Sequence, residues 1–138
     1  MDNANDKQIR LFWRVANARL EDALFLLSMK RHNAAVYLSG YVVECSLKCL
    51  LISVTPVLQR AKLVESFRGG WAHDYEVLVS RYYKNGGASF PQSIHRAMSA
   101  VSDWTTTMRY DPKVIQPKAA RQFIEAVRTI YTFMETRL

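Results

Sequence analysis

The segment from residue 34 to residue 54 carries the densest apolar pattern in the chain. One row repeats at alternating spacings of three and four, which is a helical period: Ala35, Leu38, Val42, Cys45, Cys49 and Ile52. A second row covers most of the other side: Val36, Val43, Leu47, Leu50 and Leu51. A helix that is apolar on nearly every side lies inside a bundle or spans a membrane. Glu44 and Lys48 favour the bundle, because charges are costly near a bilayer centre, and their spacing of four predicts an intrahelical ion pair.

The same periodicity predicts neighbours for this central helix. A first helix runs from about Asp6 to Arg31, and Asn33 is expected to cap the central helix. Glycines, prolines and capping residues divide the rest of the chain into four further helices. A short helix covers 57–67, and a second helix, capped by Asp74, covers 75–84. A third begins at Pro91 and carries Trp104, and the last begins at Pro117 or Lys118. No segment alternates with period two. The predicted fold is an all-α, up-and-down bundle of four to five helices, in one domain over residues 1–138.

The chain has 138 residues and a net charge of +7, from 19 basic and 12 acidic residues. This charge permits binding to RNA, DNA or another polyanion. One candidate face combines Tyr110 with basic residues near the first and last helices, and a solvated charged surface is the alternative: Arg10, Arg14, Lys30, Arg31, His32, Lys113, Lys118, Arg121 and Arg128. The first residues are polar and contain no apolar signal segment, so we expect a cytoplasmic protein that does not enter a membrane.

The two cysteines, Cys45 and Cys49, stand one helical turn apart. This spacing rarely fits the geometry of a disulfide. A structural zinc would need about two further ligands, and His32, His73 and His95 are not paired in spacing with the cysteines. We therefore expect packed thiols, no metal and no cofactor.

Three motifs resemble those of HEPN domains, which are small all-helical proteins found largely in prokaryotes. The central helix is similar to the second-helix signature of that family, with Gly40 after a small residue, then Glu44, then the pair Leu47-Lys48. His73-Asp74 is similar to a pair that opens a later helix, although Tyr75 stands where the family often has Leu. Arg109-Tyr110 resembles the Arg-Tyr that precedes the last helix in many members. Together the motifs cover most of the chain in the right order.

Each motif also has a purely structural interpretation. Asp74 is a good N-cap, with His73 packing or bonding beside it. Arg109 has a planar guanidinium that suits carboxylate or phosphate, but it could equally tie its loop to Asp111 or to a helix C-terminus. We assign Gly40, Glu44, Lys48 and Asp74 to the structural family motif. Arg109, Tyr110 and Asp111 form the candidate ligand-binding set.

The resemblance also raises the question of catalysis. Ribonuclease members carry an Arg and a His separated by four to six residues, near the start of the last helix, and two such sites in a dimer cleave RNA without a metal. No histidine follows Arg109 in residues 110–117. The pair Arg68 and His73 matches by count but lies earlier in the chain, and it provides the candidate catalytic residues. Histidine acts as an acid or base near neutral pH, and arginine stabilises charge on a phosphate.

The resemblance implies a homodimer, a minimal nucleotidyltransferase as partner protein, and a toxin–antitoxin or defence system. The small residues Ser39 and Gly40 are compatible with contact between copies. We expect a non-catalytic module that binds RNA, a nucleotide or a partner. One alternative is a metal-independent ribonuclease toxin that uses Arg68 and His73, or Arg109 with a histidine from another element. The other alternative is a structural dimerisation domain.

Overall fold

A computed structural model describes residues 6–138, and these residues form helices and no strand. Residues 1–5, which bear on the expected absence of a signal segment, lie outside the described part. The described chain contains six α-helices: α1 (Lys7–Ser28), α2 (His32–Ser53), α3 (Arg60–Ser66), α4 (Tyr75–Lys84), α5 (Gln92–Ala100) and α6 (Pro117–Glu135). Three short 3-10 helices join them: η2 (Val57–Gln59), η3 (Gly70–His73) and η4 (Thr106–Tyr110). The predicted all-α bundle is confirmed, with the seven-residue α3 as its shortest α-helix.

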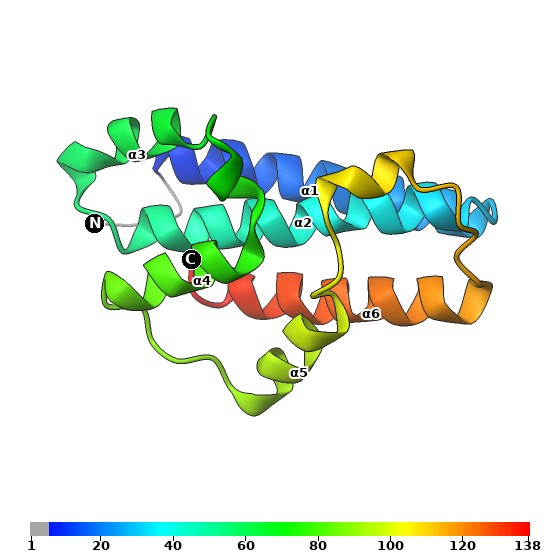
Figure 1. The fold of residues 1–138 in the computed structure, drawn as a ribbon. Helices are drawn as coiled ribbons and strands as arrows, with labels where there is room; N and C mark the ends of the chain where they lie inside the picture. Colours follow the sequence, from blue (N-terminus) through cyan, green and yellow to red (C-terminus); the bar gives the residue numbers. More distant parts are fainter. Residues whose placement is uncertain (1–5) are drawn as a thin grey trace.

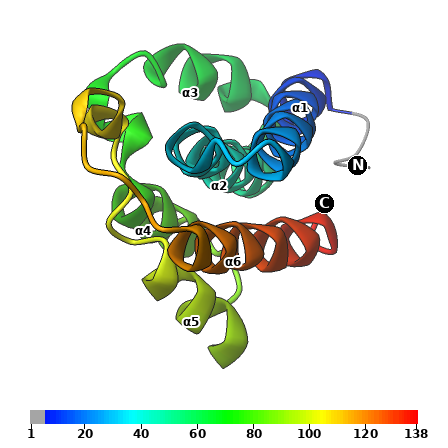
Figure 2. The same ribbon diagram turned by 90° about the vertical axis from the view of Figure 1, so that its right-hand side faces the viewer.

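Helix α2 is the centre of the bundle. Seen along its axis, it is surrounded by α1, α3, α4 and α6 (Figure 2). All residues of the two predicted apolar rows are buried except Leu38, which is partly covered, and Val42, Leu47 and Leu50 are fully buried. Among the described helices, α2 alone is long and apolar enough to cross a membrane by length and composition, and most of it is enclosed by the other helices.

Helices α1 and α6 both pack along α2 but run in opposite directions. Helix α1 runs antiparallel to α2, as the short link between them requires (Figure 1). Helix α6 runs in the same direction as α2, because residues 54–116 carry the chain back to the end where α2 begins (Figure 1). The apolar face of α6 packs on α2 and includes Val127, Ile130 and Met134.

A buried ion pair ties α1 to α3. Asp6 caps α1 by accepting hydrogen bonds from the backbone amides of Gln8 and Ile9, and its second oxygen is 2.8 Å from Arg60 Nη1. Burial raises the pKa of the Asp6 carboxyl, but the hydrogen bond from Arg60 and those from the two amides outweigh it, so the pKa is lowered overall. The stabilising effect of this carboxylate is therefore present above its unfolded pKa near 3.8 and is lost as the pH falls further.

Two of the predicted helix boundaries are wrong. Helix α2 begins at His32, with Arg31 at the N-cap position, so Asn33 is not the cap. Its side-chain amide instead donates to the carbonyl of Lys113 at 2.7 Å and accepts from the amide of Ile115 at 2.8 Å. Helix α5 ends at Ala100, so Trp104 lies in the following turn rather than on the helix. Both residues serve long-range contacts that local sequence rules do not reveal.

The cysteines are packed thiols, as predicted. Cys45 and Cys49 are both free and buried in α2. Burial raises the pKa of Cys45 to about 12 and also raises that of Cys49, whose sulfur donates to the carbonyl of Ile9 at 3.4 Å. Within residues 6–138 no three His, Cys, Asp or Glu side chains are grouped so as to hold a metal ion.

Candidate functional site

A polar row runs along α2 between its apolar rows. The row consists of Tyr37, Tyr41, Glu44 and Lys48, at spacings of four, three and four, which place them on one side of the helix. Glu44 and Lys48 are buried, whereas Tyr37 and Tyr41 are only partly covered. The row therefore begins near the surface and continues into the protein, and two short 3-10 helices bring further polar side chains to it.

Glu44 holds the buried end of the row together. One carboxylate oxygen is 3.0 Å from Lys48 Nζ, which confirms the predicted ion pair, and the other is 2.9 Å from His73 Nδ1. The side chains of Glu44 and Lys48 are only 4% and 6% exposed. Lys48 also lies against the faces of Phe12 and Phe67, with Nζ 5.6 and 5.1 Å from the ring centres. Removing either partner of such a buried ion pair destabilises the protein, because the charge that remains is not accessible to water.

His73 is placed by η3 and points one nitrogen inward. Its Nδ1 contacts Glu44 rather than Asp74, which separately caps α4 by accepting from the amides of Glu76 and Val77, as predicted. The His73 side chain is 43% exposed, so its other nitrogen is available to solvent. A carboxylate on one ring nitrogen fixes the ring orientation and leaves the second nitrogen for a proton or a ligand.

The turn that follows α5 is anchored on α2 by Trp104. The indole lies directly on Gly40, so close that a Cβ on this glycine would be 2.0 Å from the ring. The indole N–H donates to the carbonyl of Tyr37 at 3.0 Å, and its ring stacks on Tyr75 with centroids 5.5 Å apart. The Tyr75 hydroxyl donates to the carbonyl of Gly40 at 2.6 Å. Gly40 of the family motif thus makes room for an indole of the same chain.

Arg109 stands on η4 at the exposed end of the polar row. Its guanidinium donates to the carbonyl of Thr106 at 3.1 Å and lies 4.7 Å from the ring centre of Tyr110, which is 77% exposed. Hydrogen bonding to the side chains of Tyr110 and Tyr37 raises the pKa of Arg109. The guanidinium therefore stays charged at any relevant pH and remains accessible to an anion.

Tyr41 lies between Tyr37 and Glu44 in the row and interacts with both. Burial raises the pKa of its hydroxyl, helped by a 2.8 Å hydrogen bond with the Tyr37 hydroxyl. The charge on Glu44 raises this pKa further, while the charge on Arg109 lowers it, so both groups lie within electrostatic range of Tyr41. His73 thus contacts Glu44 at the buried part of the row, while Arg109 lies near Tyr37 at the exposed end.

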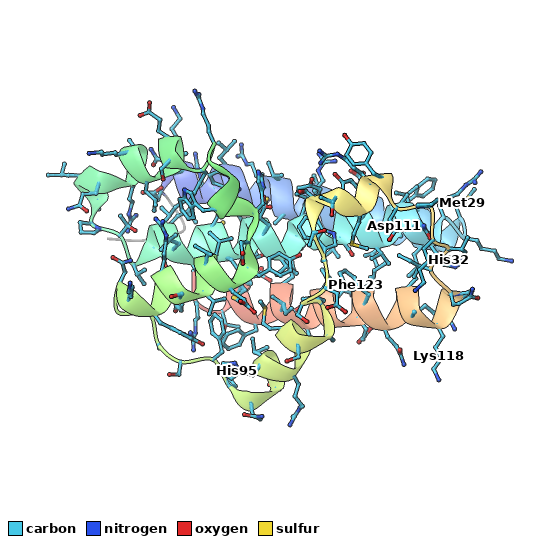
Figure 3. The ribbon with its side chains drawn as sticks, viewed as in Figure 1. Met29, His32, His95, Asp111, Lys118 and Phe123 are labelled. Atoms are coloured by element: carbon cyan, nitrogen blue, oxygen red, sulfur yellow. The ribbon has the colours of Figure 1, made fainter. Side chains whose placement is uncertain are left out.

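A cleft of about 1030 Å³ lies between α4 and α5, and His73 is among its lining residues while none of the four residues of the polar row is. Helices α4 and α5 form its sides, and His73, Thr105 and Thr106 form the part nearest η3 and η4. His95, labelled in Figure 3, projects from α5 and also lines it. Arg109 donates to the carbonyl of Thr106, which lines the cleft, but Arg109 itself is not among the lining residues.

The other predicted site residues lie in different environments from those of His73 and Arg109. Arg68 is exposed in the turn after α3, and within residues 6–138 its side chain forms no hydrogen bond or ion pair, with His73 or any other residue. Asp111 is exposed and accepts from the amide of Lys113 at 2.9 Å, which shapes the turn before α6. Ser39 and Gly40 are fully covered within the chain, so these small positions do not face a second copy.

Sequence reasoning missed the tyrosines of the polar row and the link from His73 to Glu44. The tyrosines could have been identified from the sequence, because Tyr37 and Tyr41 share a helical face with Glu44 and Lys48. No local pattern predicts the contact of His73 with Glu44, since 29 residues separate them. The 3-10 geometry of Gly70–His73 brings them together.

A comparison with known protein families identifies the family of this chain. The family described as the HEPN domain matches residues 9–137, which is nearly the whole chain. Neither a curated protein nor a solved structure matches it. The matched range includes every residue of the polar row and both 3-10 helices that flank it. The match supports a role related to RNA or nucleotides in general.

Proposed function

The chain belongs to the HEPN domain family, and from this premise we propose that it is a non-catalytic module that binds RNA or a nucleotide through Arg109. The observation that carries the proposal is the exposed pair Arg109 and Tyr110, held in place on η4 beside the polar row of α2. A guanidinium suits a phosphate, and an exposed phenol ring suits a base that stacks on it. A single strand offers both groups at adjacent positions.

The surroundings of η4 favour a negatively charged ligand. The side chain of Asn33 holds the backbone at Lys113 and Ile115 against the first turn of α2, next to Arg31. His32, the first residue of α2, and Lys118, at the start of α6, lie at the same end of the bundle (Figure 3). The net charge of +7 adds a general attraction for a polyanion.

The proposal predicts that Arg109→Ala weakens binding of a fluorescently labelled single-stranded RNA. The slope of log K against log salt concentration should become shallower by about 0.7, because one phosphate contact is lost. Fluorescence anisotropy at several salt concentrations measures both effects. Arg96→Ala is the matched control, since it removes the same charge from an exposed position on α5. Equal behaviour of the two variants would exclude Arg109 as a specific contact.

Partners form the second part of the proposal. HEPN domains commonly dimerise and pair with nucleotidyltransferases. We propose that this chain forms one HEPN domain over residues 1–138, acts as a homodimer in the cytoplasm, and works with a nucleotidyltransferase-type protein in a toxin–antitoxin or defence system. A purely structural dimerisation domain would show no salt-dependent affinity for RNA.

A second candidate function is metal-independent RNA cleavage, and one observation favours it. His73 and Arg109 come from different 3-10 helices to the same row of α2, where His73 contacts Glu44 and Arg109 lies near Tyr37. In this role the free nitrogen of His73 would take the proton of a ribose hydroxyl, while Arg109 would stabilise charge on the phosphate. Glu44 would orient the imidazole.

Cleavage of labelled RNA in the presence of a chelator tests this candidate. If His73 and Arg109 act together, His73→Ala and Arg109→Ala should each lower the rate by about a hundredfold or more, while Arg68→Ala leaves it unchanged. If Arg68 is instead the partner of His73, Arg68→Ala should lower the rate and Arg109→Ala should leave it unchanged. His95→Ala is the control for losing a cleft histidine. Intact RNA with the wild-type protein, alone and with its partner, would exclude the enzyme.

A further inference from the structure

Helix α1 carries a second apolar row on the side opposite to the core. Its members are Leu11, Val15, Phe25 and Met29, with exposed fractions of 56%, 37%, 65% and 59%. The residues of α1 that are fully buried in the bundle, Ile9, Ala16 and Ala23, lie on the other side of the helix. A surface helix needs only one apolar face, so the outer row calls for a partner.

The spacing of the outer row indicates what kind of partner it suits. Together with Ala18 and Asp22, the row follows intervals of four, three, four, three and four: Leu11, Val15, Ala18, Asp22, Phe25 and Met29. This is the seven-residue repeat of a seam between two helices, and it continues over almost the whole of α1. Scattered exposed apolar residues would not keep such a period.

We propose that α1 pairs with α1 of a second copy, antiparallel and about a two-fold axis at Ala18. The small side chain of Ala18 allows close approach where the helices cross. In this register Leu11 packs against Phe25 of the second copy, and Arg14 faces Asp22 of the second copy, each contact occurring twice. Asp22 is 52% exposed, and it also pairs with Arg19 of its own helix at 2.8 Å.

The limits of α1 support this register. The helix covers residues 7–28, so its midpoint lies within one residue of Ala18. Two copies centred there overlap along their full length of about 33 Å. The inference rests on the homodimer proposed above and identifies the surface that forms it, but it does not depend on RNA binding.

Sedimentation velocity over a range of concentrations tests the surface. The wild-type chain should be dimeric, and Phe25→Glu should raise the dimer dissociation constant by about tenfold or more, because a charge enters the centre of an apolar contact. Leu58→Glu is the matched control, since Leu58 is 98% exposed and lies outside α1. This control should remain dimeric. Both positions are on the surface, and an unchanged helical signal verifies folding.

A charge exchange tests the register. Arg14→Asp and Asp22→Arg should each weaken the dimer, because like charges then face each other, and the double variant should restore it. A dimeric Phe25→Glu variant would overturn the α1 surface while leaving the homodimer to another face. A wild-type chain that stays monomeric would overturn both. Failure of the double variant to recover would overturn the antiparallel register.

Discussion

Glu44→Ala is expected to lower the free energy of unfolding by about 3–5 kcal/mol, because it leaves Lys48 charged and buried without its carboxylate. Within residues 6–138, Lys48 would then keep only the faces of Phe12 and Phe67 around its ammonium group. His73 would lose the acceptor for its inner nitrogen as well. Urea unfolding followed by the helical circular dichroism signal measures the loss.

Two further variants make this prediction specific. Glu125→Ala makes the same substitution at an exposed position of α6, outside the proposed dimer surface, and it should cost less than about 1 kcal/mol. The double variant Glu44→Leu with Lys48→Met replaces the buried pair by apolar groups of similar size, and its stability should be close to that of the wild type or higher. A loss for Glu44→Ala as small as that of Glu125→Ala would contradict a buried pair.

Gly40→Ala is expected to be nearly as damaging, with a loss of about 3 kcal/mol, at the upper end of the usual cost of overpacking. The added methyl group would be 2.0 Å from Trp104, so the indole must leave its place. The indole would then lose its hydrogen bond to the carbonyl of Tyr37 and its stack on Tyr75. Thermal unfolding of the variant measures the effect.

Gly70 offers the matched control for this substitution. A Cβ at Gly70 would have nothing within 4 Å, so Gly70→Ala should change stability little. If the clash with Trp104 is the cause, Gly40→Ala should cost far less in a Trp104→Ala background than in the wild type. Equal costs in both backgrounds would show that Gly40 is required for another reason. Because Trp104 anchors the turn before η4, Gly40→Ala should also weaken any binding through Arg109.

Sequence reasoning was most successful where the decisive contacts are local. The burial of α2 follows from its two apolar rows, the ion pair of Glu44 with Lys48 follows from a spacing of four, and the capping by Asp74 follows from its position before a helix. Each of these features depends on residues within about one or two helical turns of each other.

The features that sequence reasoning missed depend on contacts between distant segments. Trp104 belongs to a turn because its indole fits on Gly40, and Asn33 is not a cap because its amide pairs with the backbone of residues 113–115. Nothing in the local pattern distinguishes these uses from ordinary helical ones. The outer row of α1 escapes local reasoning for a different reason: the inner row alone satisfies the amphipathic pattern that a surface helix requires.

The parallel arrangement of α2 and α6 has a consequence for the order in which the chain can fold. Helices α1 and α2 are adjacent in sequence, so they can pair as soon as both have been synthesised, with little loss of loop entropy. The side of α2 that α6 covers must wait for residues 117–135, which are synthesised after the other described helices. Until then an apolar face of the central helix is open to other chains, which makes the nascent protein most prone to aggregation in the interval before α6 is complete.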